Sequence, residues 1–175
     1  YKNGKKYGDQ KVEKFAFHLG LNSNIDYQYM YSLSYPAEGL SSLINGRLGS
    51  LDFKDGQWQG FSGKNLNVII SLDSLSSINK VSMNFYQYIN SWIFVPSYIS
   101  IMSSKDSINW EIIKSIDSIG EIRKRGKFIS SISLDSLETD TKYLKIFAKN
   151  YGKLPSWHEA AGAESWLFID EIIVE

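Results

Sequence analysis

The sequence predicts a single all-β sandwich. Apolar residues alternate with polar ones along most of the chain, turn residues separate these runs, and no window has the 3.6-residue spacing of an amphipathic helix. A chain of 175 residues with 43% apolar side chains can bury a core without disulfides, and it contains no cysteine. About eight main strands are expected.

The period-two pattern places the strands. The final segment, 166–175, is apolar on both faces, as is typical of a central strand. Residues 38–44 are the best candidate for a single helical turn, and residues 45–64 and 150–165 are expected to be long loops that carry function. The other alternating runs are 66–72, 80–85, 99–101, 110–116, 130–134 and 143–149.

Charge and composition limit the partners. Nineteen basic residues balance nineteen acidic ones, which argues against a nucleic-acid-binding protein and against a membrane-surface protein. The polar, lysine-rich start is expected to be the tail of a preceding domain plus a linker over residues 1–19, followed by one module over residues 20–175.

Several runs resemble the discoidin (coagulation factor 5/8 type C) family over roughly residues 20–175. They imply a discoidin-like jelly-roll β-sandwich of the galactose-binding-domain type, like family 32 carbohydrate-binding modules. The runs are 43–47 (LINGR), 67–73 (NVIISLD), 104–110 (SKDSINW), 141–146 (TKYLKI) and 169–172 (IDEI).

A narrower resemblance is to the C-terminal module of bacterial β-N-acetylhexosaminidases (chitobiases) of glycoside hydrolase family 20. It implies a parent hydrolase that is periplasmic, secreted or on the outer surface, with its catalytic domain as a partner of this module. The residues that carry it are 1–5 (YKNGK), 35–39 (YPAEG), 49–61 (GSLDFKDGQWQGF), 91–96 (SWIFVP) and 148–158 (AKNYGKLPSWH).

No catalytic residue is expected in this chain. Hexosaminidase chemistry needs two cooperating carboxylates, which in the family lie in a barrel that this chain lacks. Asp170 and Glu171 form the dipeptide but are neighbours on a predicted strand, so their side chains are expected to point to opposite faces.

The resemblance also implies a structural Ca²⁺ ion, which would take backbone and carboxylate oxygens from the glycine-rich loop and the last strand. Asn45 stands where the family usually has Asp, which removes a charge; the alternative is an Asn-Gly turn with Glu171 as a surface carboxylate. The implied ligands are Leu43, Asn45, Arg47, Ser50, Asp170 and Glu171.

Sugar binding by such modules depends on exposed aromatic rings, which stack on the C–H face of a pyranose. Trp92 and Trp157 are the best stacking candidates, with rim packing as the alternative for both. Trp58 is an open choice between stacking and burial, and Trp110 and Trp166 are expected in the core. The polar partners expected for the sugar are Asp52, Lys54, Asn90, His158 and Glu164.

The alternative for His158 is a structural histidine in a loop, whose ring nitrogens form hydrogen bonds with backbone groups. Membrane binding would need exposed apolar residues beside basic ones; residues 93–95 supply the first, and no basic cluster is expected near them.

The leading hypothesis is a non-catalytic module that binds terminal GlcNAc, GalNAc or galactose-type sugars through the loops around 52–61, 89–94 and 150–165. The alternatives are a structural module that packs on the catalytic barrel without binding sugar, and a protein-recognition domain.

Overall fold

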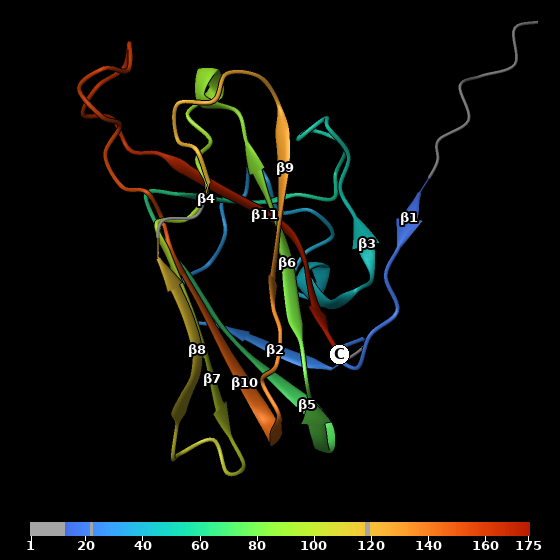
Figure 1. Ribbon diagram of the computed structural model, residues 1–175. Helices are drawn as coiled ribbons and strands as arrows, with labels where there is room; N and C mark the ends of the chain where they lie inside the picture. Colours follow the sequence, from blue (N-terminus) through green and yellow to red (C-terminus); the bar gives the residue numbers. More distant parts are fainter. Residues whose placement is uncertain (1–12, 22, 118–119) are drawn as a thin grey trace, which may run out of the picture.

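Two antiparallel sheets packed face to face form the computed structural model, which describes residues 13–21, 23–117 and 120–175 (Figure 1). The first sheet has the strand order β2 (Asn24–Tyr27), β5 (Leu66–Ile78), β10 (Thr139–Lys149), β7 (Tyr98–Ser104) and β8 (Glu111–Asp117). The second has the order β4 (Gln59–Ser62), β11 (Trp166–Val174), β6 (Val81–Gln87) and β9 (Phe128–Leu134).

The described residues contain eleven strands rather than about eight, because several are very short. β1 (Lys14–Phe15) and β3 (Arg47–Leu48) pair as a two-residue ribbon beside the sandwich. Two 3₁₀ turns complete the elements, η1 (Ser42–Ile44) within the predicted helical turn and η2 (Ile89–Ser91) after β6. The all-β prediction is confirmed, and no helix in the described part of the chain is long and apolar enough to cross a membrane.

The core lies between the two sheets, where the alternating runs place it. In β5, the side chains of Leu66, Val68 and Ile70 are buried, whereas the intervening residues are half-buried. Alternate residues are buried in the same way in β9, in β10 from Leu144 onward and in the first half of β6, whereas β7 buries residues 99–101 in succession. The period-two pattern therefore gives both the strands and their inward faces.

β11 is central, as its two-sided apolar pattern predicts. It pairs with β4 on one side and β6 on the other. The pairing with β6 shifts in register between Ile169 and Ile172, which is a β-bulge. This bulge falls on Asp170 and Glu171 and decides where their side chains point.

Trp58, not Trp110, is the core tryptophan. Trp58 is 1% exposed and packs edge to face on Tyr86, with Nε1 donating to the carbonyl of Ser50 at 3.0 Å. A Cβ atom at Gly49 would lie 2.3 Å from the indole, so only glycine fits there. The prediction for Trp110 was wrong, because this residue is half-buried just before the edge strand β8.

Trp166 is half-buried as well. Its ring packs against Tyr35 at 5.4 Å between centroids and against Phe168 at 5.7 Å. It therefore covers the aromatic cluster around Trp58 rather than lying inside it.

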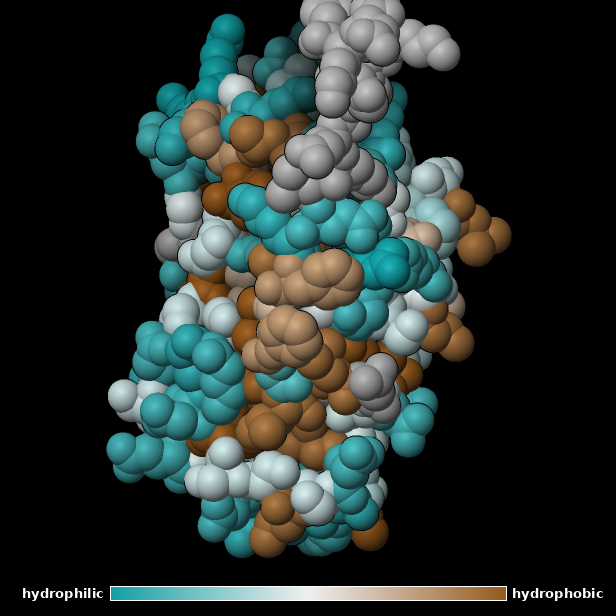
Figure 2. Space-filling view, turned by 90° about the vertical axis from the view of Figure 1, so that its right-hand side faces the viewer, coloured by the Kyte–Doolittle hydropathy of each residue, from teal (hydrophilic) through white to brown (hydrophobic). Residues whose placement is uncertain are grey.

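The segment from Glu13 to Leu19 contacts the sandwich closely. Ala16 N–H donates to the carbonyl of Gly46, and Leu19 N–H donates to the carbonyl of Val174, both at 2.8 Å. Residues 1–12 of the expected tail and linker lie outside the described residues. Figure 2 shows the face on which this segment lies, with apolar side chains gathered at its centre.

Candidate functional site

Three segments meet at the end of the sandwich that lies at the top of Figure 1. They are η2, the segment 120–127 before β9, and the loop 150–165 between β10 and β11. The β7–β8 hairpin lies at the opposite end. Two of the three loops expected to form a sugar site are therefore brought together, at 89–94 and 150–165.

Asn150 fixes the entrance of the 150–165 loop. Its Nδ2 donates to the carbonyls of Phe61, Lys64 and Ser165 at 3.1–3.3 Å, and its Oδ1 accepts from Gly152 N–H at 2.9 Å. The loop is closed further along by Leu154 N–H, which donates to the carbonyl of Ala163 at 2.8 Å. These bonds hold a loop of sixteen residues in one conformation.

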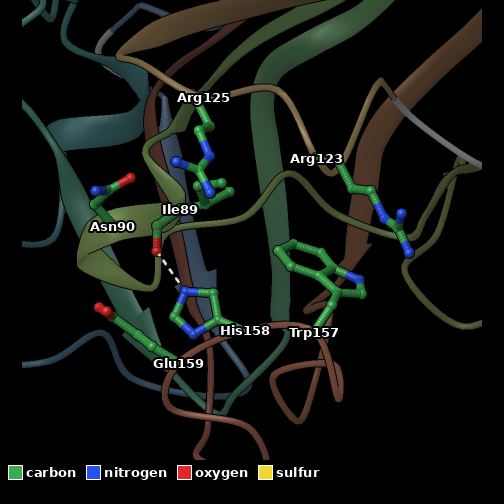
Figure 3. Close-up of a pocket in the computed structure, with 7 residues that line it drawn as sticks. All are labelled: Ile89, Asn90, Arg123, Arg125, Trp157, His158 and Glu159. Atoms are coloured by element: carbon green, nitrogen blue, oxygen red, sulfur yellow. Dashed lines mark hydrogen bonds between the residues drawn. The ribbon is translucent and has the colours of Figure 1, made fainter.

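A hollow of about 580 Å³ opens between the three segments (Figure 3). This volume falls within the range of about 300–1,000 Å³ that is usual for small-ligand sites. Polar and charged groups dominate its wall, together with one exposed indole. The lining residues are Ile89, Asn90, Arg123, Arg125, Trp157, His158 and Glu159.

His158 is a structural residue of this wall. It is 8% exposed; Nε2 lies 2.9 Å from the carbonyl of Ile89, and Nδ1 accepts from Ala160 N–H at 3.1 Å. A nitrogen that accepts an amide hydrogen carries no proton, so His158 is the neutral Nε2–H tautomer. Both nitrogens are occupied, and the expected bond to a sugar hydroxyl was wrong for this residue.

Trp157 presents part of its indole to the hollow, with 37% of the residue exposed. The guanidinium carbon of Arg123 lies 5.4 Å from its ring centroid, which is a cation–π contact. The Phe94 ring is tilted by 50° to it, at 6.3 Å between centroids. The Trp157 ring thus contacts Arg123 and Phe94, and its exposed part borders the hollow.

Asn90 also lines the hollow, at the exposed turn η2. Trp92 follows this turn and is 38% exposed, with φ of 64°, which is rare for a bulky residue. It does not line the hollow. Glu164 lies away from it too, with its side chain against Gly63.

The loop around 52–61 does not line this hollow. Lys54 lines a second hollow together with Tyr35 and Phe53, whereas Asp52 lies beside β3 in a narrower recess. Trp58 is fully covered here, so its stacking role is excluded. Of the three loops expected at the site, the one around 52–61 is therefore separate from the hollow, which lies between η2, 120–127 and 150–165.

The sequence analysis missed Arg123, Arg125 and Glu159. The signal was the run Arg123-Lys124-Arg125 with Lys127, which whole-chain neutrality conceals. A Cβ atom on Gly120 would lie 3.6 Å from the side chain of Val95, so this basic segment lies beside residues 93–95. The expectation of no nearby basic cluster was wrong, and residues 93–95 are buried rather than exposed.

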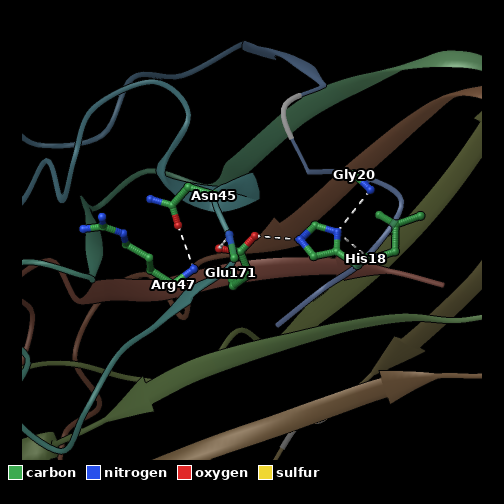
Figure 4. Close-up of polar contacts among 7 residues, drawn as sticks. His18, Gly20, Asn45, Arg47 and Glu171 are labelled. Carbon is green, nitrogen blue, oxygen red and sulfur yellow. Dashed lines mark hydrogen bonds and ion pairs between the residues drawn. The ribbon is translucent and has the colours of Figure 1, made fainter. Parts of the chain in front are cut away.

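The expected calcium ligands lie elsewhere, between η1, β3 and β11 (Figure 4). Glu171 Oε2 accepts from Gly46 N–H at 3.0 Å, and Oε1 accepts from His18 Nε2 at 3.0 Å. His18 Nδ1 accepts from Gly20 N–H at 3.1 Å, so His18 is neutral by the same argument as His158. Burial raises the pKa of Glu171, and the His18 hydrogen bond opposes that rise.

The Asp170 side chain faces the loop 46–49, as the Glu171 side chain does. Its Oδ2 accepts from Gly49 N–H at 2.9 Å and from Asn84 Nδ2 at 3.2 Å, while its buried Oδ1 has no partner. Burial raises the pKa of Asp170 to about 7. Both carboxylates therefore face residues 46–49, and the prediction that they point to opposite faces was wrong because of the bulge.

These residues do not fit a calcium ion, which needs six to eight oxygen ligands. The loop presents amide hydrogens to the carboxylates; Asn45 Oδ1 accepts from Arg47 N–H at 2.8 Å, and the Ser50 carbonyl accepts from Trp58. The Arg47 side chain is paired with Glu38, and Leu43, whose carbonyl is the implied ligand, lies within η1. No group of three or more His, Asp and Glu side chains could hold a metal within the described ranges.

No family model and no curated protein matches the chain. Solved structures do match, and they show that the fold is the two-sheet β-sandwich also found in family 32 carbohydrate-binding (CBM32) domains. One is the C-terminal domain of a chitobiase from Bacteroides fragilis, with a TM-score of 0.52, 13% identity, and coverage of 87% of this chain and 93% of that one.

Two further matches are complexes with sugars. CpGH89CBM32-4 from Clostridium perfringens, in complex with GlcNAc-α-1,4-galactose, has a TM-score of 0.53 and 12% identity, covering 98% of this chain and 100% of that one. The CBM32 of AlyQ, in complex with 4,5-unsaturated mannuronic acid, has a TM-score of 0.53 and 14% identity, covering 94% and 98%.

Proposed function

We propose that this chain is a non-catalytic carbohydrate-binding module. The observation that carries the proposal is the partly exposed ring of Trp157 beside a hollow with polar walls. An indole face packs on the C–H groups of a pyranose, and Asn90 and Glu159 supply hydrogen-bonding groups next to it. Structures with the same fold hold GlcNAc-α-1,4-galactose and GalNAc-β-1,3-galactose, which supports the assignment.

The proposed parent is a bacterial β-N-acetylhexosaminidase that is secreted, periplasmic or exposed on the outer surface. The match to a chitobiase C-terminal domain supports this attachment. A single shallow site of this kind binds weakly, with a Kd of about 0.1–1 mM. Tethering raises the effective concentration of the parent enzyme at its substrate, so weak binding is sufficient.

Calorimetric titration with GlcNAc, GalNAc, galactose and their disaccharides tests the proposal. We expect Trp157→Ala to abolish binding while the fold is retained. Trp110→Ala is the matched control, because Trp110 is a half-buried tryptophan near the β7–β8 hairpin at the opposite end. Absence of binding across a broad glycan array, or equal binding by the Trp157 variant, would contradict the proposal.

A second candidate function is a structural module that packs on the catalytic domain of the same chain. The exposed apolar side chains of the N-terminal segment favour it: Phe15, Phe17 and Leu19 are 51%, 87% and 53% exposed. Such a cluster is a candidate contact surface. Titration with the separately produced catalytic domain tests it, and Phe17→Ser is expected to weaken the association without affecting sugar binding.

A further inference from the structure

The hollow at the top of the sandwich is positively charged. Arg123 and Arg125 line it, and neither forms an ion pair with a described residue. Glu159 is the one acidic residue of its wall. The segment 121–127 carries four cations and one acid, so basic groups are concentrated here in a chain that is neutral as a whole.

The two lysines of this segment lie near other aromatic rings. Lys124 Nζ lies 4.0 Å from the ring centroid of Phe128, and Lys127 Nζ lies 5.6 Å from that of Tyr88. Neither lysine lines the hollow. The two arginines therefore supply the positive charge of the hollow, and Glu159 opposes it.

The arginines lie on either side of the stacking ring. In Figure 3, Trp157 stands between Arg123 on one side and Arg125 with His158 on the other. Arg123 is held against the ring, so the position of its guanidinium is set before a ligand arrives. A ligand packed beside Trp157 would have a guanidinium within reach of its edge.

We propose that this pocket selects glycans whose bound sugar carries a negatively charged group, either a carboxylate or a sulfate ester, which Arg123 and Arg125 hold. A guanidinium stays charged at all relevant pH values and presents paired N–H donors that match the oxygens of these groups. The inference rests on the glycan-binding function proposed above and narrows its ligand class.

An anionic membrane is the competing source of negative charge. Insertion of the rim into a bilayer would need exposed apolar side chains beside the arginines. Next to η2, Ile93, Phe94 and Val95 are at most 1% exposed, and Trp92, at 38%, is the exposed apolar side chain there. The exposed apolar surface of this rim is thus limited to the partly exposed rings of Trp92 and Trp157, which favours a soluble acidic sugar over insertion into a bilayer.

Matched pairs of sugars test the inference: galacturonic acid against galactose, glucuronic acid against glucose, and GlcNAc 6-sulfate against GlcNAc, titrated at one ionic strength. We expect at least one acidic member to bind about tenfold more tightly than its neutral counterpart, the effect of one good hydrogen bond to a charged group. The uronic acids and the sulfate distinguish the two anionic groups.

Single substitutions test whether the two arginines cause the preference for acidic sugars. Arg123→Gln and Arg125→Gln are expected to remove the preference for the acidic sugar. Lys124→Gln, which removes the same charge from the same segment outside the hollow, is expected to retain it. All three residues are exposed, so circular dichroism and the unfolding temperature serve to confirm that the variants fold.

The outcomes are distinct. Equal binding of acidic and neutral sugars would overturn this inference and leave glycan binding intact, whereas absence of binding to every sugar would overturn both. If Lys124→Gln lost the preference for acidic sugars as fully as the arginine variants, the preference would come from the overall charge of the segment. That result would overturn the assignment to Arg123 and Arg125. Binding to phosphatidylserine vesicles without binding to acidic sugars would overturn it in favour of a lipid surface.

Discussion

The imidazole Nε2 of His18 lies 3.0 Å from Oε1 of Glu171, and this hydrogen bond joins residues 153 positions apart in the chain. Both side chains are fully buried. His18 also accepts from Val174 N–H at 3.3 Å, so one ring fastens the N-terminal segment to the last strand. Its position beside Glu171 is the place where the resemblance implies a cation.

We expect His18→Ala to lower the free energy of unfolding by about 2–4 kcal/mol, because it leaves Oε1 of the buried Glu171 carboxylate and two amide hydrogens without partners. Urea unfolding measures the change. Phe17→Ala, in the same segment but 87% exposed, is the control and should change stability by less than about 0.5 kcal/mol. Equal effects of the two substitutions would show that the His18 contacts contribute nothing.

Calcium is expected to leave the unfolding temperature unchanged. The loop directs N–H groups at Asp170 and Glu171, and a cation would have to displace those hydrogen bonds and His18 together. Scanning calorimetry with added calcium, and again with a chelator, makes the measurement. A saturable rise would contradict the expectation, since a ligand at one hundred times its Kd stabilises by about 2.7 kcal/mol.

Stability is expected to fall as pH rises from about 4 to about 7. The pKa of Asp170 is about 7 in the folded state, against 3.8 for an ordinary aspartate. In this window the folded state binds more protons than the unfolded state, so the free energy of unfolding decreases with pH, by as much as a few kcal/mol in all. The raised pKa of Glu171 acts in the same direction.

Asp170→Asn isolates this contribution, because the amide copies the shape of the neutral acid. Unfolding by urea at pH 5 and at pH 7.5 is the measurement. The variant should lose most of the difference between the two pH values. If its stability changed with pH as steeply as that of the unaltered chain, Asp170 would not be the responsible group.

Asn150→Ala is expected to cost about 3 kcal/mol and to loosen the 150–165 loop, because three carbonyls and the Gly152 amide lose their partner. Hydrogen exchange at Gly152 and Leu154 should become faster, and sugar binding should weaken with it. Asn90→Ala is the control for stability, since Asn90 is exposed at η2. Unchanged exchange in the Asn150 variant would contradict this assignment.

The sheet strands could be predicted because burial alternates along them. In β5 and β10 the residues that face the core are Leu66, Val68, Ile70, Leu144 and Ile146, and each follows the expected period of two. The sequence did not reveal which tryptophan enters the core. Trp58 is buried because Gly49 makes room for it, a fit between residues from different turns.

The site was predicted in part, and the reasons differ from residue to residue. Trp157 is exposed on the 150–165 loop, and the proline and serine before it indicated a loop position in the sequence. His158 satisfies both ring nitrogens with nearby backbone, which spacing alone does not disclose. The bulge that turns Asp170 and Glu171 to one side is a long-range register shift, so strand alternation gave the wrong answer there.

The hydrogen bond between Leu19 and Val174 places the entry of the module beside its exit, at the end away from the hollow (Figure 1). A tag or bead joined after Glu175 would therefore anchor the domain by its base. Immobilised in this orientation, every copy would expose Trp157 and the two arginines to the surrounding solution.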